Sequence, residues 1–276
     1  MRFIKQIFDF YINSSIHVAI AVYCLAWLTL LKFNLPYDED VLYFIFFASI
    51  TGYNFVKYFG LAKFHHRSLA SWLKIIQVFS FICFVAMCYY ALRLNATTLL
   101  YIGGLGVVTF LYAIPLLPSK LLLDKHKNLR SISGVKVYII ALVWACVTVF
   151  LPLINTDYFI EADVIVVSLQ RFVFVLVLMF PFEIRDLQYD SIKLSTIPQQ
   201  IGVKLTKVIG VFLVGVFFLL EFFKDILLQH HIWASCIVSI LLLLALLFAK
   251  KQQGDYYSAF FVESISIIWL VLILLS

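Results

Sequence analysis

Three acidic residues at helical spacing are the strongest chemical signal in this sequence. Glu183, Asp186 and Asp190 stand at positions i, i+3 and i+7, directly after an apolar segment of membrane length. On a helix this spacing puts them in one narrow stripe, where three carboxylates can hold a divalent cation jointly. Oxygen ligands suit Mg²⁺, which shares its other positions with water and substrate phosphates. The competing interpretation is a solvated helix end, because carboxylates also occur in loops just outside a membrane.

The composition indicates which elements must position this acidic stripe. The 276 residues are 64% hydrophobic and 13% charged, with a mean hydropathy of +1.03, whereas soluble domains carry roughly a quarter charged residues. Only 10 glycines and 6 prolines interrupt the apolar runs, which favours long helices over a β-barrel. We expect an all-α polytopic membrane protein. The net charge of +6 follows the membrane topology and does not indicate a nucleic-acid partner.

Nine apolar segments have about the length that crosses a bilayer. We expect the spans at 14–31, 41–58, 72–92, 98–117, 135–154, 164–182, 205–223, 232–249 and 257–275. The connections are short, so residues 1–276 are expected to form a single transmembrane domain. The five cysteines lie in or beside these runs without a CxxC pair, and are read as small hydrophobic residues.

The distribution of lysine and arginine predicts the orientation. With a cytoplasmic N-terminus, seventeen of the 21 basic residues fall on the inner side and three on the outer side, and Arg171 lies within a span. An odd number of spans then places the C-terminus outside. The short loops and the lack of a cleavable signal peptide favour a bacterial inner membrane.

Three connections, 57–72, 118–134 and 183–204, are predicted to share the cytoplasmic side, where basic residues surround the acidic stripe. This arrangement suits a phosphate-containing ligand bridged by a metal. The candidate ligand-binding residues are Asn54, Lys57, Tyr58, Arg67, Lys120, Arg130, Lys136 and Lys193. The alternative is that the basic residues only follow the positive-inside rule, which requires no ligand.

Arg171 is a functional-site hypothesis by default, or it pairs with a carbonyl or an acid inside the bundle, because an arginine within a span is costly unless it has a role or a partner. Glu221 and Glu263, which also lie in predicted spans, are possible partners. His65 and His66 are adjacent and cannot face one site on a helix, so a solvated rim is favoured there over a zinc site.

With nine predicted spans and polar motifs after the second and sixth, the chain resembles the UbiA superfamily of intramembrane prenyltransferases over essentially its whole length. The second acidic motif of that family reads D-x-x-D-x-x-x-D, then a basic residue, a Thr-Leu-Pro-like turn and a glycine. The matching residues here are Glu183, Asp186, Asp190, Lys193, Thr196-Ile197-Pro198 and Gly202.

The resemblance implies a fold and a reaction. Nine helices would surround a central cavity that opens laterally to lipid. Mg²⁺ ions would clamp the diphosphate of a prenyl donor, and a hydrophobic acceptor, for example an aromatic one, would capture the allylic carbocation.

The chain departs from the family at the first acidic motif, N-D-x-x-D-x-x-x-D. Aligned on Asn54, the three acids become Phe55, Tyr58 and Ala62, and Lys57 is added. One hypothesis is that Lys57 contacts the diphosphate and replaces part of the missing metal charge. The simpler hypothesis is lost or altered catalysis.

Two functions therefore compete. The leading one is prenyl transfer with Mg²⁺ held by Glu183, Asp186 and Asp190. The alternative is a non-catalytic relative that binds an isoprenoid lipid or a partner protein. A small transporter is disfavoured because the sequence shows no two-fold internal repeat and no matching pair of broken spans.

Overall fold

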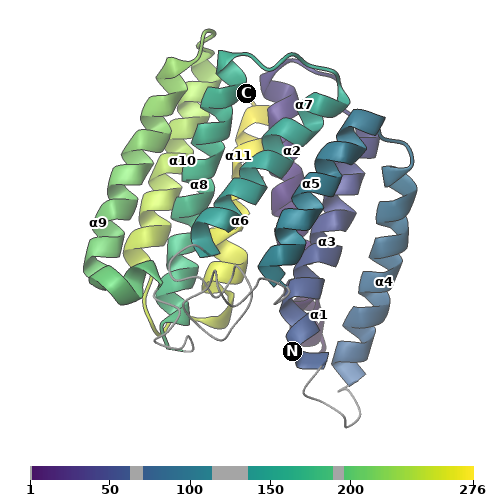
Figure 1. Cartoon of the computed structure of the whole chain (residues 1–276). Coiled ribbons are helices and arrows are strands. Elements are labelled where there is room, and N and C mark those ends of the chain that lie inside the picture. Colours follow the sequence, from purple (N-terminus) through teal and green to yellow (C-terminus); the bar gives the residue numbers. More distant parts are fainter. Residues whose placement is uncertain (1, 63–70, 114–135, 189–195) are drawn as a thin grey trace, which may run out of the picture.

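The computed structural model describes residues 2–62, 71–113, 136–188 and 196–276, and every regular element in these ranges is a helix (Figure 1). The α-helices are α1 (Arg2–Asn13), α2 (Ile16–Lys32), α3 (Glu39–Ala62), α4 (Ser71–Ala91), α5 (Ala96–Ala113), α6 (Lys136–Ala145), α7 (Leu151–Asn155), α8 (Ala162–Asp186), α9 (Ile197–Leu219), α10 (Gln229–Phe248) and α11 (Ser264–Leu274). Shorter helical turns are η2 (Cys146–Phe150), η4 (Leu220–Phe223) and η5 (Tyr257–Val262).

The helices have the lengths and composition of membrane spans. Within the described residues, six helical segments are long and apolar enough to cross a membrane, or seven if the bent pair α1 and α2 counts as one span. Helix covers most of each range predicted to span, but the count of nine spans stays a prediction. The all-helical, membrane-embedded fold is as expected from the composition.

Helix α8 is the central element of the bundle. Six consecutive residues, Val173 to Leu178, are buried, so this helix is covered on all sides. Phe174 packs against Phe217 of α9 and Trp269 of α11, with ring centroids 5.7 Å and 5.1 Å apart. Because close packing fixes the helix, the polar residues at its two ends are held in defined positions.

The N-terminal segment bends sharply before it enters the bundle. Helices α1 and α2 meet at 55° across Ser14 and Ser15, and Ser15 adopts a left-handed backbone conformation with φ of 63°. The N-terminus lies at the lower end of the bundle in Figure 1 and the C-terminus at the upper end. Helix α8 ends at the lower end, so the N-terminus and the acidic residues share one end of the molecule.

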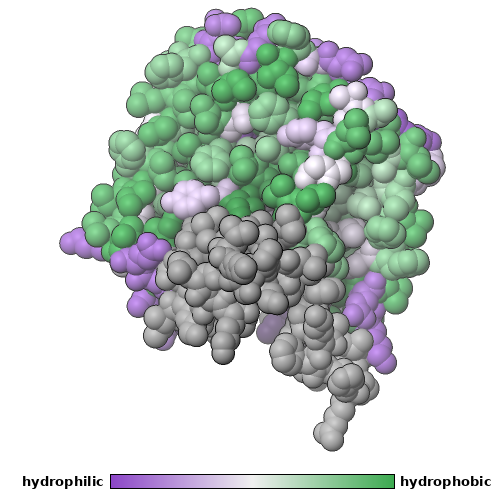
Figure 2. All heavy atoms as spheres, in the orientation of Figure 1, coloured by the Kyte–Doolittle hydropathy of each residue, from purple (hydrophilic) through white to green (hydrophobic). Residues whose placement is uncertain are grey.

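The surface of the bundle matches a membrane environment. Figure 2 shows apolar side chains over most of the visible face, with hydrophilic side chains gathered at the upper rim and along the lower edges. Large apolar side chains such as Phe81, Phe212 and Trp233 are more than 60% exposed, which hydrocarbon tolerates and water does not. Which side of the membrane each end faces stays a prediction.

Candidate functional site

The acidic end of α8 is paired with the first residue of α6. Lys136 Nζ lies 3.0 Å from Glu183 Oε1 and 4.0 Å from Asp186 Oδ2. The side chain of Glu183 is 1% exposed and that of Lys136 is 14% exposed. The helical spacing thus places the two carboxylates on one face, as predicted, and the fold adds a cation that sequence spacing did not connect with them.

A second cation engages Asp186. Arg185 contacts Asp186 Oδ1 through Nε and through Nη2, each at 2.8 Å, and its guanidinium lies 5.3 Å from the centre of the Phe182 ring. We call Lys136, Glu183, Arg185 and Asp186 the charge cluster. Its two cations and two carboxylates balance, so in this structure the cluster has no net charge.

The described residues bring two carboxylates, and no third metal-ligating side chain, to the end of α8. No group of three His, Cys, Asp or Glu side chains within them is arranged to hold a metal. Glu183 and Asp186 are each in an ion pair, and Asp186, with 24% of its side chain exposed, is the more accessible ligand. Asp190 lies outside the described residues, as do Arg67, Lys120, Arg130 and Lys193. The predicted three-carboxylate stripe therefore stays a prediction.

Asn54 makes hydrogen bonds that join three elements. Its side-chain amide nitrogen donates to Ser14 O at 2.9 Å and to Ser80 Oγ at 2.8 Å, and its Oδ1 accepts from Ser15 Oγ at 2.8 Å. The residue is 3% exposed. Asn54 therefore ties α3 to α4 and to the bend between α1 and α2, and a role in ligand binding stays a prediction.

Lys57 and Tyr58 contact the end of α1. Lys57 Nζ and Tyr58 Oη donate to the carbonyl of Asn13 at 3.2 Å and 2.8 Å. The last carbonyls of a helix lack partners within it and attract cations and donors. Lys57 also lies within electrostatic range of Glu263, which is half-buried at the start of α11, and of Arg185. The lower end of the bundle thus brings together α1, α3, α8 and α11.

An aromatic pair lies on the same helices as the candidate cations. Trp144 of α6 donates from Nε1 to the hydroxyl of Tyr53 on α3 at 2.6 Å, and the two rings meet edge to face. Trp144 lies about two turns from Lys136 along α6. The hydrogen bond holds α6 against α3 inside the apolar part of the bundle.

The Thr-Ile-Pro turn begins α9. Thr196 precedes the helix, its backbone N–H donates to Gln199 Oε1 at 3.0 Å, and Pro198 stands in the first turn. Gly202 has φ of +80° and bends the helix one turn later, a conformation that glycine adopts without steric cost. The helix starts at residue 197, earlier than the predicted span at 205–223.

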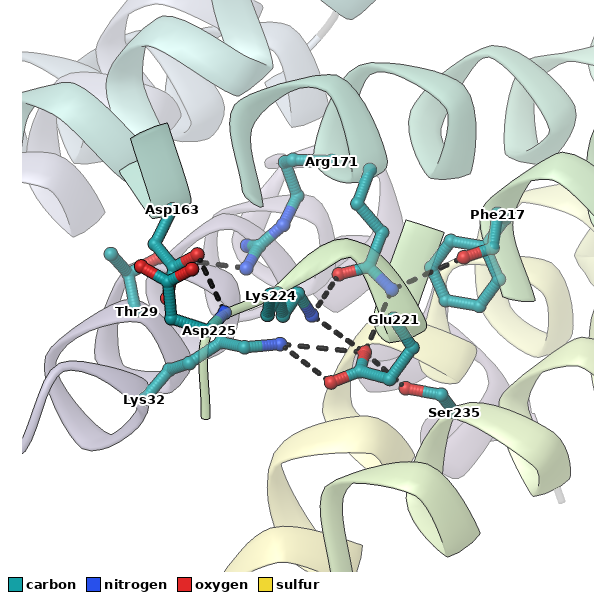
Figure 3. Close-up of polar contacts among 10 residues, drawn as sticks. Thr29, Lys32, Asp163, Arg171, Phe217, Glu221, Lys224, Asp225 and Ser235 are labelled. Carbon is teal, nitrogen blue, oxygen red and sulfur yellow. Dashed lines mark hydrogen bonds and ion pairs between the residues drawn. The ribbon is translucent and has the colours of Figure 1, made fainter. Parts of the chain in front are cut away.

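Of the partners predicted for Arg171, the structure shows a backbone carbonyl and neither of the two carboxylates. Its Nη1 donates to Leu25 O at 2.7 Å and to Thr148 Oγ1 at 3.3 Å, and the guanidinium lies 5.3 Å from the centre of the Trp269 ring. Glu221 is instead bound by Lys32 at the end of α2 and by Lys224, three residues further along the chain (Figure 3). Sequence reasoning missed this arrangement, although Lys32, Glu221 and Lys224 at predicted span ends were a signal that could have been pursued.

Comparisons with known proteins bear on the fold. No protein-family model and no curated protein matches the sequence. Among solved structures, the chain is similar to a digeranylgeranylglyceryl phosphate synthase studied in membranes, with a TM-score of 0.59 and 17% identity over 98% of each chain. At this identity the likeness shows a shared fold.

Proposed function

We infer that this protein is a UbiA-type membrane prenyltransferase, which moves a prenyl group from a prenyl diphosphate to a hydrophobic acceptor. The observation that carries the proposal is the charge cluster at the end of α8. It combines carboxylates and cations at the position of the family's second acidic motif, in a chain that shares its fold with a digeranylgeranylglyceryl phosphate synthase. Membrane lipid surrounds the bundle, so both substrates can reach the site from the hydrocarbon phase.

The cations of the cluster supply the chemistry that a diphosphate leaving group needs. Lys136 and Arg185 exchange part of their contact with Glu183 and Asp186 for contact with diphosphate oxygens. The bond between C1 of the prenyl chain and the diphosphate oxygen breaks, and its electron pair leaves with the diphosphate. Fixed positive charge stabilises that developing negative charge. The acceptor bonds to C1, and the proton that it loses passes to the released diphosphate.

The apolar part of the bundle suits the carbocation and the chain. Tyr53 and Trp144 are aromatic side chains near the helices that supply the cations, and ring faces attract a positive charge in a dry environment. Water is excluded by the surrounding leucine, valine and phenylalanine side chains of the core, which limits hydrolysis of the cation.

Mg²⁺ remains part of the proposal as a prediction. When bound, it would neutralise diphosphate charge, with oxygen ligands from Glu183, Asp186 and Asp190. The two described carboxylates are already paired with Lys136 and Arg185, so a bound Mg²⁺ would have to displace part of these contacts.

A non-catalytic relative is the second candidate, and one observation favours it. The three acids of the family's first motif are replaced by Phe55, Tyr58 and Ala62. The remaining Asn54 and the added Lys57 bond to groups of the protein itself. Such a protein would bind the isoprenoid lipid, or a partner, without transferring the prenyl group.

The test is diphosphate release by the purified protein in nanodiscs, with geranyl to longer prenyl diphosphates and a Mg²⁺ titration. The double variant Asp186→Asn, Asp190→Asn removes two carboxylates of the motif. Asp157→Asn is a matched control because Asp157 is exposed and lies beyond α7, outside the charge cluster. Release by the wild type and the control but not by the double variant supports transfer. Donor binding without release supports the non-catalytic relative. If the protein neither binds the donor nor releases diphosphate, both candidate functions are contradicted.

The role of Lys57 is separable from that of the cluster. If Lys57 contacts the diphosphate, Lys57→Ala weakens donor binding, whereas Lys250→Ala, an exposed lysine elsewhere, leaves it unchanged. Unchanged donor affinity in Lys57→Ala would limit Lys57 to its contact with Asn13 at the end of α1.

A further inference from the structure

A group of lysines lies at the lower end of α9 and α10, outside the charge cluster. Lys204 and Lys207 are in the first half of α9, and Lys250 and Lys251 come just after the end of α10. Figure 1 shows the start of α9 beside the end of α10, and Figure 2 shows hydrophilic side chains gathered there below the apolar surface of the two helices. We call these four lysines the lysine patch.

A hydrogen bond joins the two parts of the patch. Lys207 Nζ donates to the carbonyl of Leu247 at 2.7 Å, and this carbonyl lies in the last turn of α10, where it has no partner inside the helix. Lys250 lies within electrostatic range of Lys207. Lys207 makes no other hydrogen bond within the described residues, so two of its three N–H donors are available to a ligand. The patch is therefore one surface formed by two helices.

The patch has little negative charge to balance it. No ion pair of its four lysines occurs among the residues that the structure describes. Residues 196–212 contain no acidic residue, and residues 249–256 contain only Asp255. All members of the patch except Lys207 are exposed. Four cations are thus accompanied by one carboxylate in these two segments, and the surface attracts an anion.

Apolar side chains that face lipid lie next to the lysines. Val208 follows Lys204, and Val211 follows Lys207, by four residues along α9, so each pair shares one face of the helix. Val208 and Val211 are 57% and 42% exposed, and Leu247 of α10 is 54% exposed. The surface is therefore charged at the rim and apolar one turn deeper. A soluble anion would use only the lysines, whereas a phospholipid has a part for each half.

We propose that the lower end of α9 and α10 is a binding site for an anionic phospholipid of the phosphatidylglycerol type. Its phosphate accepts hydrogen bonds from the ammonium groups of the lysine patch, and its acyl chains lie along the exposed apolar side chains of the two helices. Basic residues next to spans attract anionic lipid head groups. The positive-inside rule alone explains lysines at one end of the spans, but it does not require two helices to bring them together without carboxylate partners.

The test is a count of the lipid that stays bound to the full-length protein in detergent, by native mass spectrometry. The protein is incubated with an equimolar mixture of phosphatidylglycerol and phosphatidylcholine that have the same chains, with or without excess inorganic phosphate. We expect saturable binding of phosphatidylglycerol, with a preference of about tenfold over phosphatidylcholine. Inorganic phosphate should not displace the lipid, because it lacks the apolar part. No preference between the lipids would overturn the proposal, and displacement by phosphate would do so in favour of a soluble anion.

Two double variants connect the preference with the site. Lys204→Gln, Lys207→Gln should weaken the binding of phosphatidylglycerol by about thirtyfold, which is a factor of about five for each lysine. Lys5→Gln, Lys74→Gln removes the same charge from exposed lysines of α1 and α4 and should keep the affinity. An equal loss in both would mean general surface attraction and would overturn the proposal. The wild-type preference decides even if a variant does not fold, and none of these measurements depends on prenyl transfer.

Discussion

Lys136 and Glu183 join the start of α6 to the end of α8 through an ion pair whose carboxylate is almost fully buried. Such a pair adds little stability compared with apolar side chains of similar size, but the removal of one partner leaves a buried charge without compensation. The pair is therefore suited to a site in which a charged ligand replaces one of the two residues as the partner of the other. Asp186, which is more exposed, can exchange its contacts more easily.

We expect Lys136→Met to lower the free energy of unfolding by about 3 kcal/mol, because it leaves the Glu183 carboxylate without its ammonium. The double variant Lys136→Met, Glu183→Leu should recover most of this loss. Chemical unfolding in detergent measures both, with the exposed Lys250→Met as the control. If Lys136→Met is as stable as the wild type, the Lys136–Glu183 ion pair does not contribute to the free energy of unfolding.

The variant Asn54→Ala tests whether this residue of the family motif stabilises the fold or binds the ligand. Asn54→Ala removes three hydrogen bonds within the protein and should cost about 2 kcal/mol of unfolding free energy. Gln252→Ala changes an exposed amide and should cost less than about 0.5 kcal/mol. If Asn54→Ala has normal stability but binds the donor more weakly, Asn54 contacts the donor and is not mainly structural.

At the scale of elements, the approach of α9 to α8 and α10 depends on one glycine. A methyl group at Gly210 would meet the Leu246 side chain and lie 3.0 Å from Phe180 Cδ2. Both of these side chains are fully buried and cannot move aside easily. Small residues allow helices to approach closely in membranes, so this position sets the distance between α9 and its neighbours.

Gly210→Ala should therefore destabilise the protein by about 1 to 3 kcal/mol through overpacking. Gly215→Ala on the same helix meets open space and should be neutral or stabilising by up to about 1 kcal/mol, because alanine favours a helix. Thermal unfolding of the two variants in the same detergent gives the comparison. Equal effects would mean that the close approach at Gly210 carries no energetic consequence.

The element scale is where the sequence was most informative. Apolar runs of membrane length predicted the helices, and prolines and polar clusters predicted most of their ends, because hydrophobicity and helix breaking act locally. The early start of α9 was missed, because the helix begins at the Thr-Ile-Pro turn and bends at Gly202. Helix α1 was missed as well, because a short half-polar segment before the first span has no apolar run of membrane length.

At the scale of the whole molecule, side-chain pairing could not be predicted. Lys136 and Glu183 were both selected from the sequence, but as a diphosphate contact and a metal ligand. Only the packing of α6 against α8 shows that they neutralise each other. For Arg171 the sequence left a carbonyl and a carboxylate open as partners, and the structure shows a backbone carbonyl and hydroxyl oxygens. Contacts between distant segments depend on tertiary geometry, which one sequence does not contain.

The bundle thus has two polar regions with different character. At the lower end, the charge cluster is balanced and partly exposed, as a site that exchanges contacts with a charged ligand requires. Towards the other end, Glu221 is buried and paired with Lys32 and Lys224. Apolar packing of α8 against α9 and α11 separates them, so a prenyl chain and an acceptor would meet near the lower end.

The most direct test of the central claim is a crystal structure of the protein with geranylgeranyl thiodiphosphate, a donor analogue that resists ionisation. We predict phosphorus density next to Lys136 and Arg185 at the end of α8, with the Lys136–Glu183 contact lengthened and the prenyl chain directed into the apolar bundle. Phosphorus density at another position, or a charge cluster unchanged while the analogue is bound elsewhere, would contradict the assignment of this site to prenyl diphosphate chemistry.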